Sequence, residues 1–269
     1  MSNTDFNEVD RDRWQKALEV LLAEPIEPIQ ILTLRPKVWK SATRPFLARG
    51  EDKQEYIVKA RHADRSIERQ MFNDQIVARL GVIMNAPVGK PSLVEISTEL
   101  IELSPQYSYI LSGIAHGTEF IKDCSDDREL FNHIKVPENR ERFALLCVLY
   151  SWVYARDHQF IYSKTKPNLV YSVDHGHFFI GGPDWTVERL TQEHHDLEID
   201  SIMLKNCKLT EQELKPALIA CEAVTENDIL NVVASPPCEW NITMDDRMAL
   251  VEYLTSRQKK IKALYPNLC

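Results

Sequence analysis

An uncharged apolar run from Phe143 to Ala155 constrains this chain more than any other stretch. A helix that is apolar on every side has to be buried in a protein core or in a membrane. The run is well below the ~20 residues that a membrane-spanning helix needs. We therefore expect a buried helix over this stretch, and we expect it to hold the residues that follow it rigidly in place.

The residues after this helix carry a candidate cation site. Asp157 follows almost at once, and Asn168 and Asp174 flank the strand-like run LVYSV. Each of these side chains alone is more often a cap or turn residue. As a set, they supply oxygen atoms of the kind that bind Mg²⁺, which completes its shell with water and substrate phosphates. The pattern therefore favours a phosphoryl-transfer site.

A lysine and an acid upstream supply the other half of such a site. In the strand-like run EYIVK, side chains alternate, which directs Lys59 to the same side as Ile57. On the next predicted helix, Asp74 lies on the apolar stripe that includes Met71, and an acid in such a place needs a partner. Kinases pair their phosphate-binding lysine with an acid on the following helix. We expect Lys59 and Asp74 to pair, while a solvated end of the stripe is the alternative for Asp74.

Secondary-structure patterns divide the chain in two. Residues 6–22 have the pattern of an amphipathic helix, and residues 29–113 combine short strands with one long helix over 64–81. The last two strand candidates of this part are KPSLVEI and YSYILSG. Helical patterns dominate from residue 114 onward, and three helices have capping signatures at Thr210, Thr225 and Thr243. We predict an α+β fold of two lobes that form one catalytic unit, with a β-rich N-terminal lobe (1–113, including the first helix) and a helical catalytic lobe (114–269).

Composition excludes several other classes of function. The formal net charge of −8 gives no basic footprint for direct nucleic-acid binding. No glycine-rich dinucleotide or P-loop pattern occurs, and glycine is scarce at 8 residues, so a nucleotide has to be bound by another kind of loop. The six cysteines form no CxxC pair and the chain has no signal-like start. We expect a cytoplasmic protein with reduced thiols and no membrane segment.

Four stretches resemble the HipA-like kinases, bacterial relatives of the protein and phosphoinositide kinases. SATRPFLARGEDKQEYIVKA is similar to the family's phosphate loop and lysine strand, and FNDQIVARLGVIMNAPVGKPSLVEI to the helix and strand that follow. RDHQFIYSKTKPNLVYSVDHGHFF resembles the catalytic loop and the Asp-His-Gly metal motif. PPCEWNITMDDRMALVEYLTSRQ resembles the Trp-containing turn and the last helices. The resemblance implies a two-lobe, protein-kinase-like fold and a kinase that uses ATP and Mg²⁺.

The resemblance also assigns roles to individual residues. Lys59, paired with Asp74, would contact the nucleotide phosphates, and Asp157 would orient or deprotonate the acceptor hydroxyl. Asn168 and Asp174 would hold magnesium. Backbone groups of the phosphate loop would bind phosphate, at Ser41, Ala42 and Thr43. A serine or threonine of a protein substrate is the implied acceptor, and the family also suggests an antitoxin-like or regulatory protein partner.

This chain differs from the family pattern in three places. Asp74 stands where the family usually has Glu, and Ala155 and His158 stand where it tends to have Asn and Arg. The stretch from Asp157 to Asn168 looks longer than usual by a few residues, which would reshape the acceptor site.

Two alternative functions remain open from the sequence. His175 and His177 form an HxH pair that, on a strand, would point both rings to one face, as in a zinc-dependent hydrolase. That interpretation leaves Lys59, Asp74 and Asn168 without a role. The other alternative is a pseudokinase, an ATP-binding regulatory module that has lost phosphoryl transfer.

Overall fold

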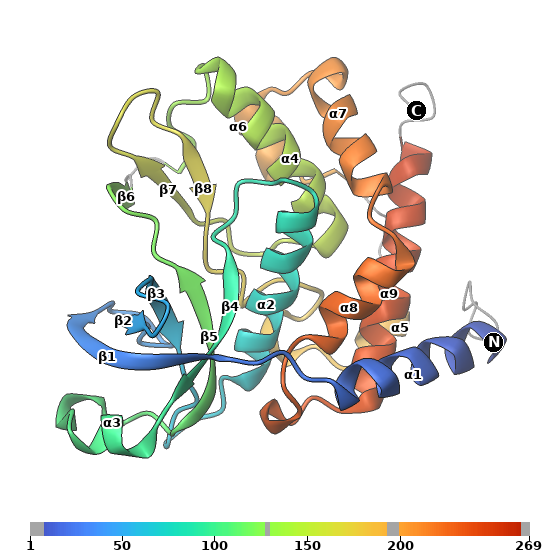
Figure 1. Ribbon diagram of the computed structural model, residues 1–269. Coiled ribbons are helices and arrows are strands. Elements are labelled where there is room, and N and C mark those ends of the chain that lie inside the picture. The colour runs from blue at the N-terminus through green and yellow to red at the C-terminus, as the bar shows by residue number, and fades with distance from the viewer. Residues whose placement is uncertain (1–7, 127–129, 193–198, 265–269) are drawn as a thin grey trace.

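Five strands in the first half of the chain close into a barrel, which lies at the lower left of Figure 1. The computed structural model describes residues 8–126, 130–192 and 199–264. The strands follow the spatial order β1-β2-β3-β5-β4. They are β1 (Ile29–Val38), β2 (Phe46–Gly50), β3 (Glu55–Lys59), β4 (Pro91–Ile96) and β5 (Gly113–Glu119). All neighbours are antiparallel except β1 and β4, which close the barrel in parallel.

The alternation of side chains along the strands fills the interior of the barrel and turns Lys59 of β3 away from it. Phe46 and Ala48 of β2 and Tyr56 and Val58 of β3 belong to the apolar core of the barrel. Because neighbouring residues of a strand point to opposite faces, Lys59 points away from that core. The sequence predicted this alternation, and β3 ends at Lys59.

Helix α2 (Glu68–Ile83) lies between the barrel and the helical part of the molecule (Figure 1). Its contacts include β4 and β5 on one side and helices α4 and α8 on the other. Gly81 permits the close approach to its neighbours, since a Cβ at this position would lie 2.8 Å from Val88 and 3.2 Å from Leu149. The short helices α3 (Thr98–Glu102) and η1 (Pro105–Tyr107) follow β4.

The strand expected over YSYILSG is wrong. Residues 105–107 form η1, which Pro105 begins, and Tyr107 is fully buried against Phe46 of the barrel. The strand β5 starts only at Gly113 and includes the HGTE residues. The aromatic and β-branched residues of this stretch are typical of a strand, but Tyr107 lies in a 3₁₀ turn and packs its ring on the barrel core.

The remaining chain is mainly helical and is built around α4 (Pro137–Val153), the apolar helix that the sequence predicted. A three-stranded sheet flanks it, of order β6-β7-β8, and further helices surround it. The sheet strands are β6 (Cys124–Asp126), β7 (Phe160–Ser163) and β8 (Val170–Ser172). The other elements are η2 (Gly182–Asp184), α5 (Val187–Gln192), α6 (Ser201–Cys207), α7 (Glu211–Glu222), α8 (Glu226–Ala234), η3 (Cys238–Trp240) and α9 (Met244–Leu264).

The three predicted capping signatures are confirmed. Thr210 and Thr225 each accept a hydrogen bond from the backbone of the third helical residue, whose own carboxylate accepts from the threonine N–H. Thr243 and Asp246 make the same reciprocal pair at the start of α9. The predicted α+β composition, with a β-rich first part and a mainly helical second part, is likewise confirmed.

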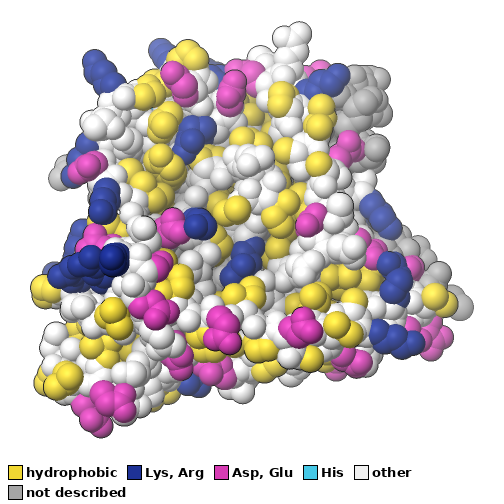
Figure 2. Space-filling model, in the orientation of Figure 1, with side chains coloured by type: hydrophobic (Ala, Val, Ile, Leu, Met, Phe, Trp, Pro, Cys, Tyr) yellow, Lys and Arg dark blue, Asp and Glu magenta, His cyan; other side chains and the backbone are white. Residues whose placement is uncertain are grey.

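The first helix, α1 (Glu8–Ala23), packs against α8 and α9 rather than on the barrel. All of β5 lies in the barrel, so the barrel ends after Glu119, a few residues beyond the expected boundary at 113. Among the described residues no helix has the length and apolar character to span a membrane. On the face drawn in Figure 2, basic and acidic side chains are interspersed and neither charge dominates.

Candidate active site

Lys59 joins the barrel to the helical part through two carboxylates. Its Nζ donates to Asp74 Oδ2 at 2.7 Å and to Asp174 Oδ1 at 2.6 Å. The lysine side chain is 6% exposed and that of Asp74 3%, whereas Asp174 is 28% exposed. Burial disfavours the ammonium, but the two carboxylates outweigh it and raise the pKa of Lys59. The pairing of Lys59 with Asp74 is therefore present, and the solvated alternative for Asp74 is wrong.

Asp74 also fixes the backbone beside Asp174. Its Oδ1 accepts the N–H of His175 at 2.7 Å. Burial raises the pKa of this carboxyl, but Lys59 and two nearby histidines overcome that and the pKa of Asp74 is lowered. One short acid on α2 thus holds the lysine with one oxygen and the loop of Asp174 with the other. An aspartate suffices because α2 lies close to both groups.

Gln159 lies opposite Val173, the residue before Asp174, because β7 pairs with β8. The register places Phe160 opposite Ser172, and Val173 N donates to Gln159 O at 3.1 Å. Gln159 Nε2 donates to Asp157 Oδ2 at 2.7 Å, so the amide orients the predicted catalytic carboxylate. Gln159 was not among the residues predicted for the site, although its place directly before the strand-like FIYS was a usable signal.

Two oxygen atoms here have the chemistry to hold a divalent cation. Within the described chain, Asp174 Oδ2 and Gln159 Oε1 accept no hydrogen bond, while the other polar atom of each side chain is engaged. A carboxylate and an amide oxygen are ligands suited to Mg²⁺. Asp174 adopts a left-handed backbone conformation, with φ of 61°, which Asp tolerates better than most residues.

Asn168 is not brought together with Asp174. It lies in the turn between β7 and β8, where its Nδ2 donates to Ser163 O at 2.9 Å and its φ is 60°. Strand β8 lies between Asn168 and Asp174, and an extended chain over these six residues reaches roughly 20 Å, at about 3.3 Å per residue. The two residues therefore lie at opposite ends of β8, and the side-chain Nδ2 of Asn168 is already engaged by Ser163 O. The apparently long loop from Asp157 is in fact a short loop, the strand β7 and a hairpin turn.

The predicted phosphate loop connects β1 and β2. Arg44 N donates to Ser41 O at 3.2 Å and closes a turn, and His62 contacts Thr43 O at 3.1 Å. Within the described residues, the N–H groups of Ala42 and Thr43 have no acceptor. Free N–H groups in a tight turn can bind an anion. The turn follows strand β1, which, like the lysine strand β3, pairs with β2.

A second set of contacts ties α2 to the segment after Asp174. Asn73 is fully buried, and its Nδ2 donates to Gly176 O at 2.9 Å and to Phe178 O at 3.2 Å. Its Oδ1 accepts Trp185 Nε1 at 3.0 Å. One turn earlier, Arg69 stacks on Trp185 at 3.9 Å and pairs with Asp246. Asn73 was not predicted as a functional residue, although it begins the run of three polar residues, Asn73 to Gln75, within an otherwise apolar helix.

The histidines that suggested zinc lie apart. His175 is buried and its Nε2 contacts Ser172 Oγ at 2.7 Å, whereas His177 is exposed. His158 pairs with Asp200, the N-cap of α6. No group of three metal-binding His, Cys, Asp or Glu side chains is present in the part of the chain that is described; His194 and His195 lie outside it. Burial lowers the pKa of His175 to about 4, so the ring is neutral near pH 7.

This chain resembles known proteins in fold and in sequence. A crystal structure of the Helicobacter pylori proinflammatory kinase CtkA is similar, with a TM-score of 0.58 and 10% identity over 90% of this chain and 98% of that one. The golgi casein kinase structure has a TM-score of 0.42 and 12% identity, over 99% of this chain and 79% of that one. No curated protein matches the sequence. The family described as HipA-like kinase matches residues 31–258. This match covers most of the protein, and the chain therefore belongs to the HipA-like kinase family.

Proposed function

We propose that this chain transfers the γ-phosphoryl group of ATP, with Mg²⁺, to a serine or threonine hydroxyl of a protein. The observation that carries the proposal is the buried Lys59, which contacts Asp74 and Asp174 at 2.7 and 2.6 Å. A buried ammonium between a structural acid and a partly exposed one is suited to phosphate oxygens, because phosphoryl transfer depends on positioning and charge stabilisation.

Each residue then has a defined task. Lys59 binds phosphate oxygens, and the N–H groups of Ala42 and Thr43 hold the phosphate from the other side. Asp157, oriented by Gln159, accepts the hydrogen bond of the acceptor hydroxyl through its remaining oxygen. We assign the metal to Asp174 and Gln159 in place of Asn168. When bound, the metal neutralises charge on the phosphates.

The acceptor and the partners follow from the family rather than from the residues. A protein substrate and a regulatory or antitoxin-like partner are part of the proposal on that ground alone. Asp157 lies in the short loop between α4 and β7, and a loop held by rigid elements is a common place for a group that meets substrate.

Intact-mass analysis after incubation with labelled ATP and Mg²⁺ tests the proposal. We expect the mass of one or more phosphoryl groups on the protein, or label on added serine and threonine peptides, with neither in Asp157→Asn. An adenylyl adduct would contradict the assigned reaction. Tight ATP binding without turnover in both proteins would support the pseudokinase instead.

A further inference from the structure

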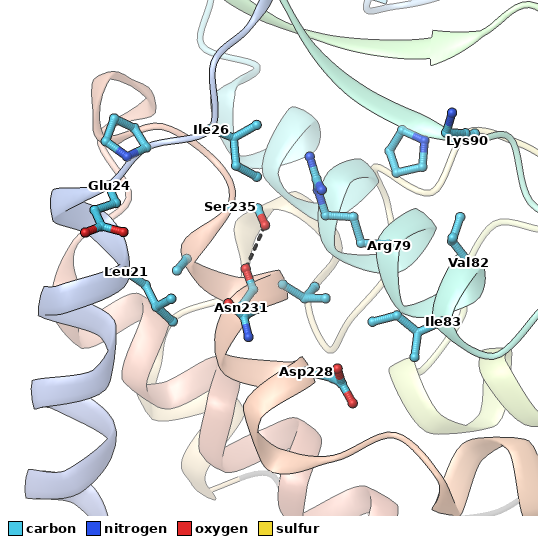
Figure 3. A pocket seen from close by; sticks show the side chains of 14 residues that line it. Leu21, Glu24, Ile26, Arg79, Val82, Ile83, Lys90, Asp228, Asn231 and Ser235 are labelled. Atoms are coloured by element: carbon cyan, nitrogen blue, oxygen red, sulfur yellow. Dashed lines mark hydrogen bonds between the residues drawn. The ribbon is translucent and has the colours of Figure 1, made fainter.

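A pocket of about 420 Å³ lies beside the C-terminal half of α2 (Figure 3). It is enclosed by the end of α1 and the chain after it, by the last turns of α2 and by α8. By helical geometry Ile83, nine residues after Asp74, points to the opposite side of α2. The volume falls in the range of small-molecule sites.

Among the described residues, the pocket holds a cation without a counter-ion. Arg79 is half-buried, and its Nε donates to the neutral Gln75 Oε1 at 2.9 Å. No acid contacts its guanidinium in the described part of the chain, and burial lowers the pKa of Arg79. A desolvated charge without a partner is unfavourable. The two terminal nitrogens of a guanidinium form a fork that fits a carboxylate.

Three other charged side chains line the pocket: Lys90, which is already paired, and the acids Asp228 and Glu24, which disfavour a ligand with two negative charges. Lys90 pairs with Glu119 at 2.7 Å, and Asp228 is held by Thr225 at the start of α8. Glu24 also lines the pocket. A guanidinium that lies among these acids suits an anion with a single charge better than a phosphate dianion.

The walls are apolar and remain accessible. Ile26 and Val82 are each 43% exposed and Ile83 is 38% exposed, which is unusual for large aliphatic side chains that lie together. Figure 3 shows Arg79 beside these side chains. We propose that this pocket is a binding site for a small monocarboxylate with an apolar body, whose carboxylate binds Arg79 and whose body packs on Ile26, Val82 and Ile83.

A ligand at Arg79 would be connected to the active site. Gln75, which holds Arg79, donates through Nε2 to His116 Nδ1 at 2.9 Å and to Ser92 O at 2.7 Å. His116 lies opposite Lys59 in the β3–β5 pair. An effect of the ligand on ATP rests on the proposed function, whereas binding of the ligand does not.

Titration of the full chain with hexanoate, followed by NMR, tests the site. Hexylamine, with the same chain and the opposite charge, is the ligand control. We expect hexanoate to shift signals of pocket residues with saturation in the millimolar range, and hexylamine to leave them unshifted. Arg79→Gln should weaken hexanoate binding at least tenfold.

A second variant, at Val82, tests the site without changing Arg79. Val82→Trp should fill the pocket and abolish binding, while Val20→Trp, at an exposed site on α1 that does not line the pocket, should leave it unchanged. The proposal is overturned if hexanoate and hexylamine bind alike, if Val82→Trp binds as wild type does, or if hexanoate causes no saturable shift. None of these outcomes depends on kinase activity.

Discussion

Removal of the charge on Lys59 should destabilise the protein as well as stop phosphoryl transfer. In Lys59→Met, Asp74 would keep the N–H of His175 but would lose the ammonium that it contacts, at 3% exposure. Breaking a buried ion pair typically costs about 3–5 kcal/mol. Asp74 can limit the loss by taking up a proton, which from its ordinary pKa of 3.8 costs about 4 kcal/mol at pH 7, with each pH unit worth about 1.36 kcal/mol.

We therefore expect the free energy of unfolding of Lys59→Met to fall by about 3–4 kcal/mol at pH 7. Urea unfolding followed by tryptophan fluorescence measures it. The difference from wild type should shrink as the pH falls toward 4, because Asp74 protonates more easily in the variant. The double variant Lys59→Met/Asp74→Asn should recover most of the stability, since the amide that replaces the carboxylate stays neutral and still accepts from His175, but it should remain inactive.

A wild-type unfolding midpoint for Lys59→Met would refute the buried pair. So would a double variant as unstable as the single one, because the loss would then come from packing of the lysine stem and not from an unpaired carboxylate.

Three further predictions concern neighbouring residues. Asn73→Asp replaces the amide that donates to Gly176 O and Phe178 O by a group that can only accept. We expect the free energy of unfolding to fall by about 2–3 kcal/mol and phosphoryl transfer to require more Mg²⁺. An unchanged Mg²⁺ requirement would show that Asn73 does not position Asp174. Gln159→Ala should raise the Mg²⁺ concentration for half-maximal transfer at least tenfold while Asn168→Ala leaves it unchanged, and the reverse order would restore Asn168 to the metal site. Burial lowers the pKa of His116 and of His175 to about 4. Each ring binds a proton near pH 6.5 only when unfolded, so stability should fall from pH 6.5 to 4 by up to about 3 kcal/mol per histidine, more steeply in wild type than in His175→Gln; equal slopes would contradict this.

The fold could be predicted from the sequence because its main signals are local. The apolar helix α4, the alternating strand that ends at Lys59 and the threonine caps each follow from spacing alone. The segment around Tyr107 could not be predicted in this way, since its composition is that of a strand and its turn is fixed by tertiary contacts, the packing of Tyr107 on Phe46 and the hydrogen bond from its hydroxyl to Arg35 O.

The site residues with distinctive chemistry could be predicted from the sequence. Those whose position depends on the pairing register of β7 and β8 could not. Lys59, Asp74 and Asp174 were identified and lie together. The sequence indicates Asn168 as a metal ligand, and we propose Gln159 instead because the pairing of β7 with β8 sets Asn168 in the hairpin turn. Gln159 precedes β7 and Asn168 precedes β8, so the two amides look equally suited to hold a metal until the register of the two strands is known.

Calorimetric titration of ATP, with and without Mg²⁺, tests the central claim most directly. The account predicts Mg²⁺-dependent ATP binding in the wild-type protein and in Asn168→Ala, and loss of the Mg²⁺ dependence in Asp174→Asn. Binding that is indifferent to Mg²⁺ in the wild type, or that is retained unchanged in Asp174→Asn, would contradict the assignment of Lys59, Gln159 and Asp174 to a nucleotide–metal site.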